Sequence, residues 1–195
     1  MNYLAHAYLS FHHSGILIGN MTSDFIKGKK QYDLPSDIQV GIRLHRLIDE
    51  FTDSHKVTSE AKQLFREDYR LYSGAFIDIV YDHFLAKDET RLPDATLKAF
   101  AQEVYASLEE RQEVLPERFK RMLPFMKEQN WLYHYNNTWG IANSFAGLVR
   151  RAKYITESNT AFNIFKLHYE QLKGYYEEFI PEVESLSRNY IAAHL

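Results

Sequence analysis

Apolar residues recur along most of this chain at the 3.6-residue spacing of an α-helix. Between about residues 15 and 29, for example, one helical face carries Ile16, Leu17, Met21, Phe25 and Ile26. No stretch alternates apolar and polar residues over several positions, as a half-buried strand does. Glycine and proline are few, with 8 and 5 among 195 residues, which disfavours a turn-rich β fold. The sequence therefore predicts an all-α fold, a compact multi-helix bundle that forms a single domain over residues 1–195.

The same periodicity, together with capping residues, gives approximate helix boundaries. We expect helices at about residues 2–12, 15–29, 37–54, 59–72, 75–87, 94–114, 116–128, 139–154 and 160–194, with 131–139 ambiguous. Ser36 and Thr58 are candidate N-caps, because a hydroxyl can accept a hydrogen bond from a free backbone N–H at a helix start. Gly174 and Pro181 are expected to kink or split the last helix.

The composition excludes several kinds of site and partner. The chain has no cysteine, which removes disulfides, thiolate nucleophiles and cysteine-ligated metal centres and fits a reducing cytoplasm. The formal net charge is −3, so binding to nucleic acid through bulk positive charge is disfavoured. No apolar run approaches the roughly 18–20 residues of a membrane span, and the first residues lack the basic region of a signal peptide. We therefore expect a cytoplasmic protein that neither enters a membrane nor binds nucleic acid, with its oligomeric state left open.

The most distinctive polar pattern is the four-residue spacing of His45, Asp49 and Asp53. Residues four apart lie on nearly one face of an α-helix, so these side chains would form one polar stripe. On a helical wheel the stripe lies between an apolar arc and an arc that contains Arg43 and Arg46, as a cleft-lining face would. Partly desolvated carboxylates repel one another unless a cation lies between them. The stripe indicates ligands of a divalent metal, although a solvated polar stripe remains the alternative.

A second predicted helix carries a similar set about thirty residues later, Asp78, Asp82 and His83. Asp78 and Asp82 share a face, and His83 reaches the same point only from its flank. Two helices with carboxylate and imidazole groups predict a site for a metal that accepts oxygen and nitrogen ligands. A carboxylate majority favours Mn²⁺ or Mg²⁺, and Fe²⁺ or Zn²⁺ is also compatible.

Other polar residues are weaker candidates. His6 lies in an apolar, aromatic stretch, where a lone histidine is usually a core residue with its own hydrogen bonds. Asp24 stands next to apolar residues, an unusual place for a carboxylate. Arg150, Arg151 and Lys153 form a compact basic cluster, which either complements a helix C-terminus or docks an acidic partner or a phosphate.

Five segments follow one another between residue 2 and about residue 155: NYLAHAYLS, GNMTSDFIKG, GIRLHRLIDEFTD, VYDHFLA and Asn143–Arg151. Together they resemble segments of the acyl carrier protein phosphodiesterases, most specifically in GIRLHRLIDEFTD and YDHFL. The resemblance implies hydrolysis of the phosphodiester that joins 4′-phosphopantetheine to a serine of holo-acyl carrier protein. It also implies dependence on Mn²⁺ and a fold related to the HD phosphohydrolases. Carried over by motif, its site residues are Asn2, His6, Asp24, His45, Asp49, Asp53, Asp78, Asp82 and His83. The order Asp82-His83 reverses the His-Asp doublet of HD enzymes.

The expected chemistry is attack of a metal-activated water on phosphorus, with the metal offsetting charge on the phosphoryl oxygens. We expect catalytic roles for His6, Asp24 and His83, with either histidine protonating the leaving serine oxygen. The acidic carrier protein would dock on the Arg150, Arg151 and Lys153 cluster. Two alternatives stay open. One is a metal-dependent phosphohydrolase of a nucleotide or other small phosphoester, and the other is a non-enzymatic helical binding module.

Overall fold

The computed structural model describes residues 1–195 and consists of helices and connecting turns, without a strand, which confirms the all-α fold. The α-helices are α1 (Tyr3–Tyr8), α2 (Ser14–Thr22), α3 (Ser36–Ser54), α4 (Lys56–Tyr69), α5 (Ser73–Ala86), α6 (Asp94–Glu110), α7 (Glu117–Glu128), α8 (Trp131–His134), α9 (Thr138–Arg151), α10 (Asn159–Leu167) and α11 (Tyr169–Ala192). Short 3-10 helices are η1 (Ser23–Phe25), η2 (Gly28–Asp33), η3 (Arg70–Tyr72) and η4 (Gln112–Val114). None of these helices combines the length and apolar character needed to cross a membrane.

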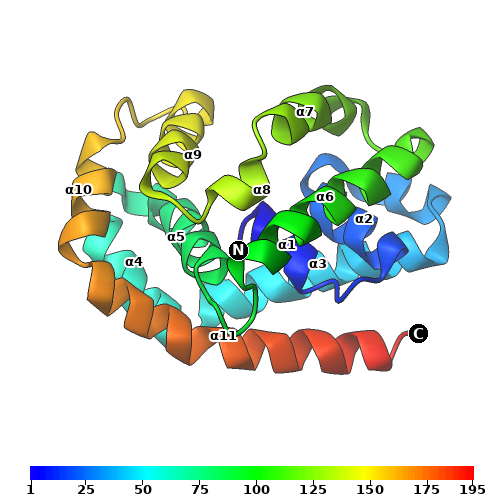
Figure 1. Cartoon of the computed structure of the whole chain (residues 1–195), viewed down its shortest axis with the longest axis horizontal. Coiled ribbons are helices and arrows are strands. Elements are labelled where there is room, and N and C mark those ends of the chain that lie inside the picture. The colour runs from blue at the N-terminus through cyan, green and yellow to red at the C-terminus, as the bar shows by residue number, and fades with distance from the viewer.

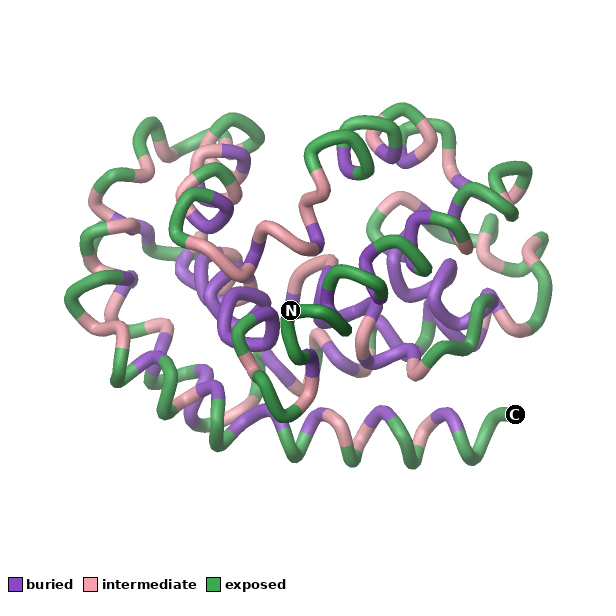
Figure 2. Tube along the Cα trace, viewed as in Figure 1, coloured by how far each residue is buried: buried purple, intermediate pink, exposed green.

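The helices pack around α3 and α5. Helix α5 contacts α1, α4, α9 and α11, and α11 continues past α4, α5 and α3 along one side of the molecule (Figure 1). On the opposite side, α8 lies between α7 and α9 (Figure 1). Buried residues concentrate in α2, α3 and α5, whereas α11 buries only one face (Figure 2). One hydrophobic core of 50 buried residues runs from Met1 to Ile191 and joins these elements.

Helices α2 and α3 approach each other closely enough to exclude side chains at their contact. A Cβ atom on Gly19 would lie 2.1 Å from the carbonyl oxygen of Ile38, and one on Gly41 would lie 2.2 Å from that of Ile16. Glycine at both positions therefore lets the two backbones touch. This close packing brings Asn20, the residue after Gly19, beside the polar stripe of α3.

Several predicted helices end earlier than expected, and the first two have a visible cause. The helix predicted over residues 2–12 stops at Tyr8, because Phe11 and His12 adopt positive φ angles of 46° and 63° that cannot continue a right-handed helix. The helix predicted over residues 15–29 stops at Thr22 and continues as the single turn η1. The extended backbone of Ile26 and Lys27 then breaks the helical path.

Other boundaries also differ from the prediction. Pro35, and not Ser36, occupies the N-cap position of α3. Thr58 lies within α4, and its hydroxyl is 3.2 Å from that of Tyr81.

The break in the C-terminal region falls at His168 and not at Gly174 or Pro181. Both of these residues are exposed on α11, where solvent can satisfy the carbonyl that proline leaves without a partner.

Candidate metal centre and active site

A cavity of about 450 Å³ lies where the N-terminal end of α1 meets α3. Residues of α1, α2, η1, α3, α5, α7 and α9 contribute to its wall. The acidic and imidazole side chains that line it are His6, Asp24, His45, Asp49, Asp53 and Asp78. Asn2 lines it as well, so the structure gathers seven of the nine site residues that the family resemblance implied around one space.

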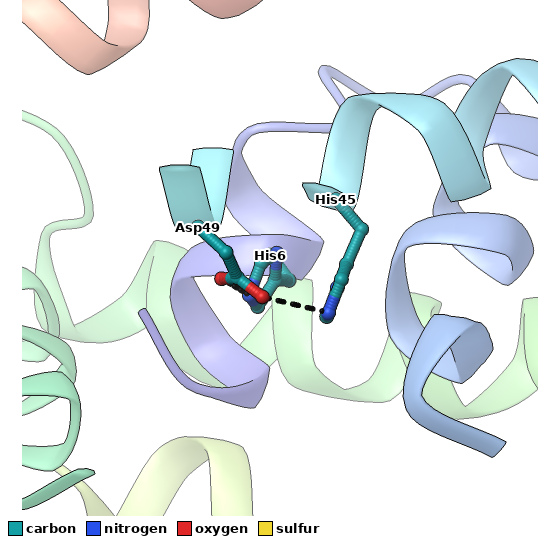
Figure 3. A group of neighbouring side chains, drawn as sticks. All are labelled: His6, His45 and Asp49. Atoms are coloured by element: carbon teal, nitrogen blue, oxygen red, sulfur yellow. Dashed lines mark ion pairs between the residues drawn. The ribbon is translucent and has the colours of Figure 1, made fainter. Parts of the chain in front are cut away.

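His6, His45 and Asp49 form the tightest group in this cavity. Their candidate ligand atoms all lie within 4.8 Å of one another (Figure 3). The Nε2 atom of His45 is 3.1 Å from one carboxylate oxygen of Asp49, and Nε2 of His6 is 3.3 Å from the other. Both histidines are buried, with 3% and 6% of their surface exposed, and neither Nε2 atom has a hydrogen-bond partner. Two buried ring nitrogens therefore face one carboxylate without forming a hydrogen bond to it.

Asn20 sets the orientation of both imidazole rings. The Nδ1 atom of His45 is 2.8 Å from the backbone oxygen of Asn20, and Nδ1 of His6 is 2.7 Å from its side-chain oxygen. The side-chain nitrogen of Asn20 donates to the His6 carbonyl and to Ser10 Oγ, which confirms that its oxygen faces His6. Each Nδ1 must therefore donate a proton. A neutral ring then carries its lone pair on Nε2, toward the cavity.

The local charges shift the pKa values of these groups in opposite directions. Burial, with His45 beside it, lowers the pKa of His6 to about 4. Burial acts in the same direction on His45, but the carboxylates of Asp24 and Asp49 outweigh it and raise its pKa to about 9. Although burial opposes ionisation of Asp49, the two histidines hold its pKa well below the usual value. With no cation bound, the site at neutral pH thus contains a neutral His6, a protonated His45 and an ionised Asp49.

The lone pair of neutral His6 consequently faces an Asp49 oxygen at 3.3 Å, so that two acceptors oppose each other. A cation between them would remove this repulsion. Asp24 lies on η1, with a carboxylate oxygen 3.3 Å from His45 Nε2 and a largely exposed side chain. Its pKa is lowered by His45, so it adds a further negative group to the same point. The donor set of two imidazoles and one or two carboxylates fits a divalent metal.

Two predicted ligands line the cavity but have other partners. Asp53 forms an ion pair of 2.6 Å with Lys62 and is exposed. Asp78 is 2.8 Å from the α-amino group of Met1. Neither carboxylate belongs to the tight group around His45.

The structure separates Asp82 from the predicted metal site. Asp82 is fully buried, and its two oxygens accept hydrogen bonds from the backbone N–H groups of Asn2, Leu4 and Ala5. These N–H groups form the free N-terminal end of α1, which a carboxylate satisfies well. Asp82 therefore fixes the helix that carries His6 and does not join the tight ligand group.

His83 does not line the cavity and has its partners elsewhere. Its Nδ1 atom is 2.7 Å from the Tyr135 carbonyl oxygen, and its Nε2 atom is 3.3 Å from the Tyr169 hydroxyl. Burial lowers the pKa of His83 to about 4. The predicted roles of His83 as metal ligand and proton donor thus have no geometric support in this arrangement.

The basic cluster predicted from the sequence divides between the cavity and the surface. Arg151, at the end of α9, lines the cavity together with Arg118 of α7. Neither guanidinium forms an ion pair within the chain, so both can meet an anion. Arg150 and Lys153 are exposed nearby. The cavity therefore contains carboxylates and also two guanidinium groups, those of Arg118 and Arg151, that have no ion-pair partner.

Sequence reasoning missed several of these residues. Asn20 could have been found, because a polar amide in the apolar segment GILIGNM is unusual for a buried helix face. Arg118 and Tyr3 had no such signal, since they enter the cavity through packing of distant helices.

Comparison with known proteins yields one family. Residues 1–183 match the sequence profile of a family described as acyl carrier protein phosphodiesterase. A protein of that name from Photorhabdus laumondii is 31% identical over 190 residues, which cover 97% of this chain and 96% of the relative. Relatives of the same name from Yersinia pestis and Pectobacterium atrosepticum are 31% and 30% identical over 182 and 189 residues. These alignments cover 93% and 96% of this chain, and 94% and 98% of the relatives. No solved structure matches the chain.

Proposed function

The chain belongs to the acyl carrier protein phosphodiesterase family, and from that membership we propose its reaction. It hydrolyses the phosphodiester between 4′-phosphopantetheine and a serine of holo-acyl carrier protein. The products are apo-acyl carrier protein and 4′-phosphopantetheine. One observation supports this proposal for the chain itself: the buried Nε2 atoms of His6 and His45 face the Asp49 carboxylate and neither forms a hydrogen bond.

We propose that His6, His45 and Asp49 hold a divalent cation, with Asp24 as a further ligand. Mn²⁺ is the first candidate, and Mg²⁺ or Fe²⁺ would fit the same oxygen and nitrogen donors. When bound, such a cation supplies Lewis acidity, which offsets charge on phosphoryl oxygens and makes water a stronger acid. Asn20 supports this role by holding both Nδ1–H groups, because such outer partners fix the orientation and tautomer of ligating histidines.

The other cavity residues have roles that follow from their charge. Arg118 and Arg151 bind the non-bridging oxygens of the phosphodiester, since guanidinium groups match phosphate oxygens in geometry and charge. The phosphorus atom then lies between these arginines and the histidine cluster. This placement brings the scissile bond next to the residues that bind the cation.

Departure of the serine oxygen requires a proton, and we assign its donor to Tyr3. At neutral pH His6 is unprotonated at Nε2, and His83 lies outside the cavity. Tyr3 lines the cavity, and burial raises its pKa to about 12, so the phenol keeps its proton. The only partner of that hydroxyl is the sulfur of Met122 at 3.8 Å, a weak acceptor.

The protein part of the substrate would dock beside Arg150, Arg151 and Lys153. An acidic carrier protein is attracted to this exposed cluster, although the net charge of the chain is −3. We also propose a cytoplasmic location, which the cysteine-free sequence favours.

The test uses mass spectrometry to measure conversion of holo- to apo-acyl carrier protein, once with Mn²⁺ present and once after chelation. We expect conversion with Mn²⁺, loss of conversion with chelator, and no comparable turnover of a nucleotide panel. Asp49→Asn should abolish conversion, whereas Asp68→Asn, an exposed carboxylate on α4 without an ion pair, should not. Turnover of nucleotides alone would favour a small-phosphoester hydrolase. No turnover of any phosphoester and no Mn²⁺ binding would leave only a helical binding module.

A further inference from the structure

A second cavity, of about 400 Å³, adjoins the first. Helices α8 and α9 form much of its wall, together with Gln129 just after α7, and Figure 1 shows α8 between α7 and α9. Asn2, Tyr3 and Arg151 line both cavities. The two spaces therefore meet beside the guanidinium of Arg151, which the proposed function places at the phosphodiester.

Both tryptophans of the chain line this second cavity. Trp139 is 60% exposed, although it packs edge-on against His134 with ring centroids 5.3 Å apart. Trp131 is half-buried, and its indole N–H donates to Gln129. Exposed indole surface at the wall of a cavity offers an apolar contact that the free protein does not use.

The polar groups of the second cavity are uncharged or cationic. Asn143 and Ser144 of α9 offer amide and hydroxyl groups, and none of the 13 lining residues is acidic. The first cavity, in contrast, contains four aspartates in its wall. The second cavity thus suits a neutral chain that carries hydrogen-bonding amides and is joined to an anion at the Arg151 end.

We propose that the second cavity binds the pantetheine arm of the substrate, with the phosphodiester at the junction of the two cavities. This inference rests on the proposed function. 4′-Phosphopantetheine is a phosphate followed by a neutral chain of methyl groups, a hydroxyl, amides and a thiol. The cavities follow the same order, from the histidine cluster through Arg151 to the indole and amide groups. Trp139 contacts the apolar parts of the arm, and Asn143 pairs with one of its amides.

Intrinsic tryptophan fluorescence tests this placement directly, because Trp131 and Trp139 are the only indoles and both line the cavity. The full-length protein with Mn²⁺ is titrated with 4′-phosphopantetheine, and binding is measured in parallel by calorimetry. We expect a saturable change in emission with the same midpoint as the heat signal. Inorganic phosphate, which reaches only the junction, should leave the emission unchanged. Calorimetric binding without an emission change, or no binding at all, would overturn the proposal.

Two substitutions locate the contacts within the cavity. Trp139→Ala and Asn143→Ala should each weaken 4′-phosphopantetheine binding about tenfold, the size expected for loss of an aromatic contact or an amide hydrogen bond. Phosphate affinity should not change. Phe125→Ala and Asn163→Ala are matched controls, because Phe125 is 56% exposed, Asn163 is exposed on α10, and neither lines the cavity. Variants that bind like the controls would rule out the subsite.

The hydrolysis assay separates failure of this inference from failure of the proposed function. If the chain is not a phosphodiesterase for holo-acyl carrier protein, the unmodified protein itself gives no apo product. If the activity is present but the arm binds elsewhere, Trp139→Ala and Asn143→Ala hydrolyse the substrate with unchanged KM. We expect a KM raised about tenfold with kcat largely retained, because the arm contacts are made in the ground and transition states alike.

Discussion

The His6 ring stacks on the His45 ring, with centroids 4.0 Å apart and planes inclined by 21°. The two residues come from α1 and α3, and Asn20 of α2 holds the Nδ1 atoms of both. Three helices therefore cooperate to direct two Nε2 atoms at the carboxylate of Asp49 (Figure 3). Burial disfavours the charged form of His6, and repulsion between two protonated rings at this separation adds to that effect, so His6 stays neutral beside a protonated His45.

Cation binding should release a proton from His45. The pKa of His45 is raised to about 9 and that of His6 is lowered to about 4, so at pH 7 only His45 must lose a proton to become a ligand. We expect release of about one proton per Mn²⁺ at pH 7, and an affinity that rises about tenfold per pH unit until about pH 9. Calorimetry in buffers of different ionisation enthalpy measures the release. A pH-independent affinity between pH 6 and 8 would contradict this assignment.

Asn20→Ala should weaken Mn²⁺ binding by about 10- to 100-fold, the usual effect of removing the outer partner of a ligating histidine. The side-chain oxygen that holds His6 is lost, whereas the backbone oxygen that holds His45 remains. Isothermal titration gives the affinity, and circular dichroism monitors helix content. Asn163→Ala provides the matched control on an exposed helical position. Unchanged affinity in a folded Asn20→Ala protein would show that the ring of His6 needs no such support.

The helical wheel predicted the outer face of α3 well. Arg43 and Arg46 are exposed and Asp49 lies at the boundary, as the wheel predicted, whereas His45 is buried more deeply than a boundary position, beside Ile48. Such a prediction succeeds because the face that α3 buries is wide and apolar, and the 3.6-residue period then fixes the position of each polar residue.

The same reasoning failed on α5, because a wheel does not show which element packs on a face. The side of α5 that carries Asp82 meets the N-terminal end of α1, whose N–H groups take both oxygens. A wheel likewise could not show that Asn20 of α2 and Arg118 of α7 line the cavity, because this depends on how α2 and α7 pack around α1 and α3. Family resemblance placed His6 and Asp24 near the stripe, whereas spacing alone could not.

His83→Gln and His45→Gln should have opposite effects on metal binding. His83 contacts Tyr135 and Tyr169 outside the cavity, so its replacement should lower thermal stability while Mn²⁺ affinity stays within about twofold. His45→Gln removes a proposed ligand and should abolish measurable binding. Differential scanning calorimetry and metal titration on the same samples separate the two effects. Loss of Mn²⁺ binding in a stably folded His83→Gln protein would return His83 to the site.

Asp82→Asn should destabilise the fold by about 1–3 kcal/mol, because an amide cannot accept all three N–H groups at the start of α1. Burial raises the pKa of Asp82 to about 7, above its unfolded value near 4. Between about pH 4 and pH 7 the folded state therefore binds a proton at Asp82 that the unfolded state has lost. The stability that Asp82 contributes falls as the pH rises through this range. Urea unfolding should show the advantage of the wild type over Asp82→Asn shrinking across this range. An advantage that grows with pH would mean that Asp82 is ionised throughout.

Arg151→Ala and Lys153→Ala remove the same charge from neighbouring positions, but only Arg151 lines the cavities. Loss of a charge-assisted contact to phosphate should lower kcat/KM of Arg151→Ala for holo-acyl carrier protein by roughly 10- to 100-fold. Because Lys153 would act only in docking, Lys153→Ala should lower kcat/KM a few-fold. This loss relative to the wild type should disappear at high salt. The measurement is kcat/KM of both variants at low and high ionic strength. Equal losses that both vanish with salt would assign Arg151 to docking alone and leave the phosphodiester to Arg118.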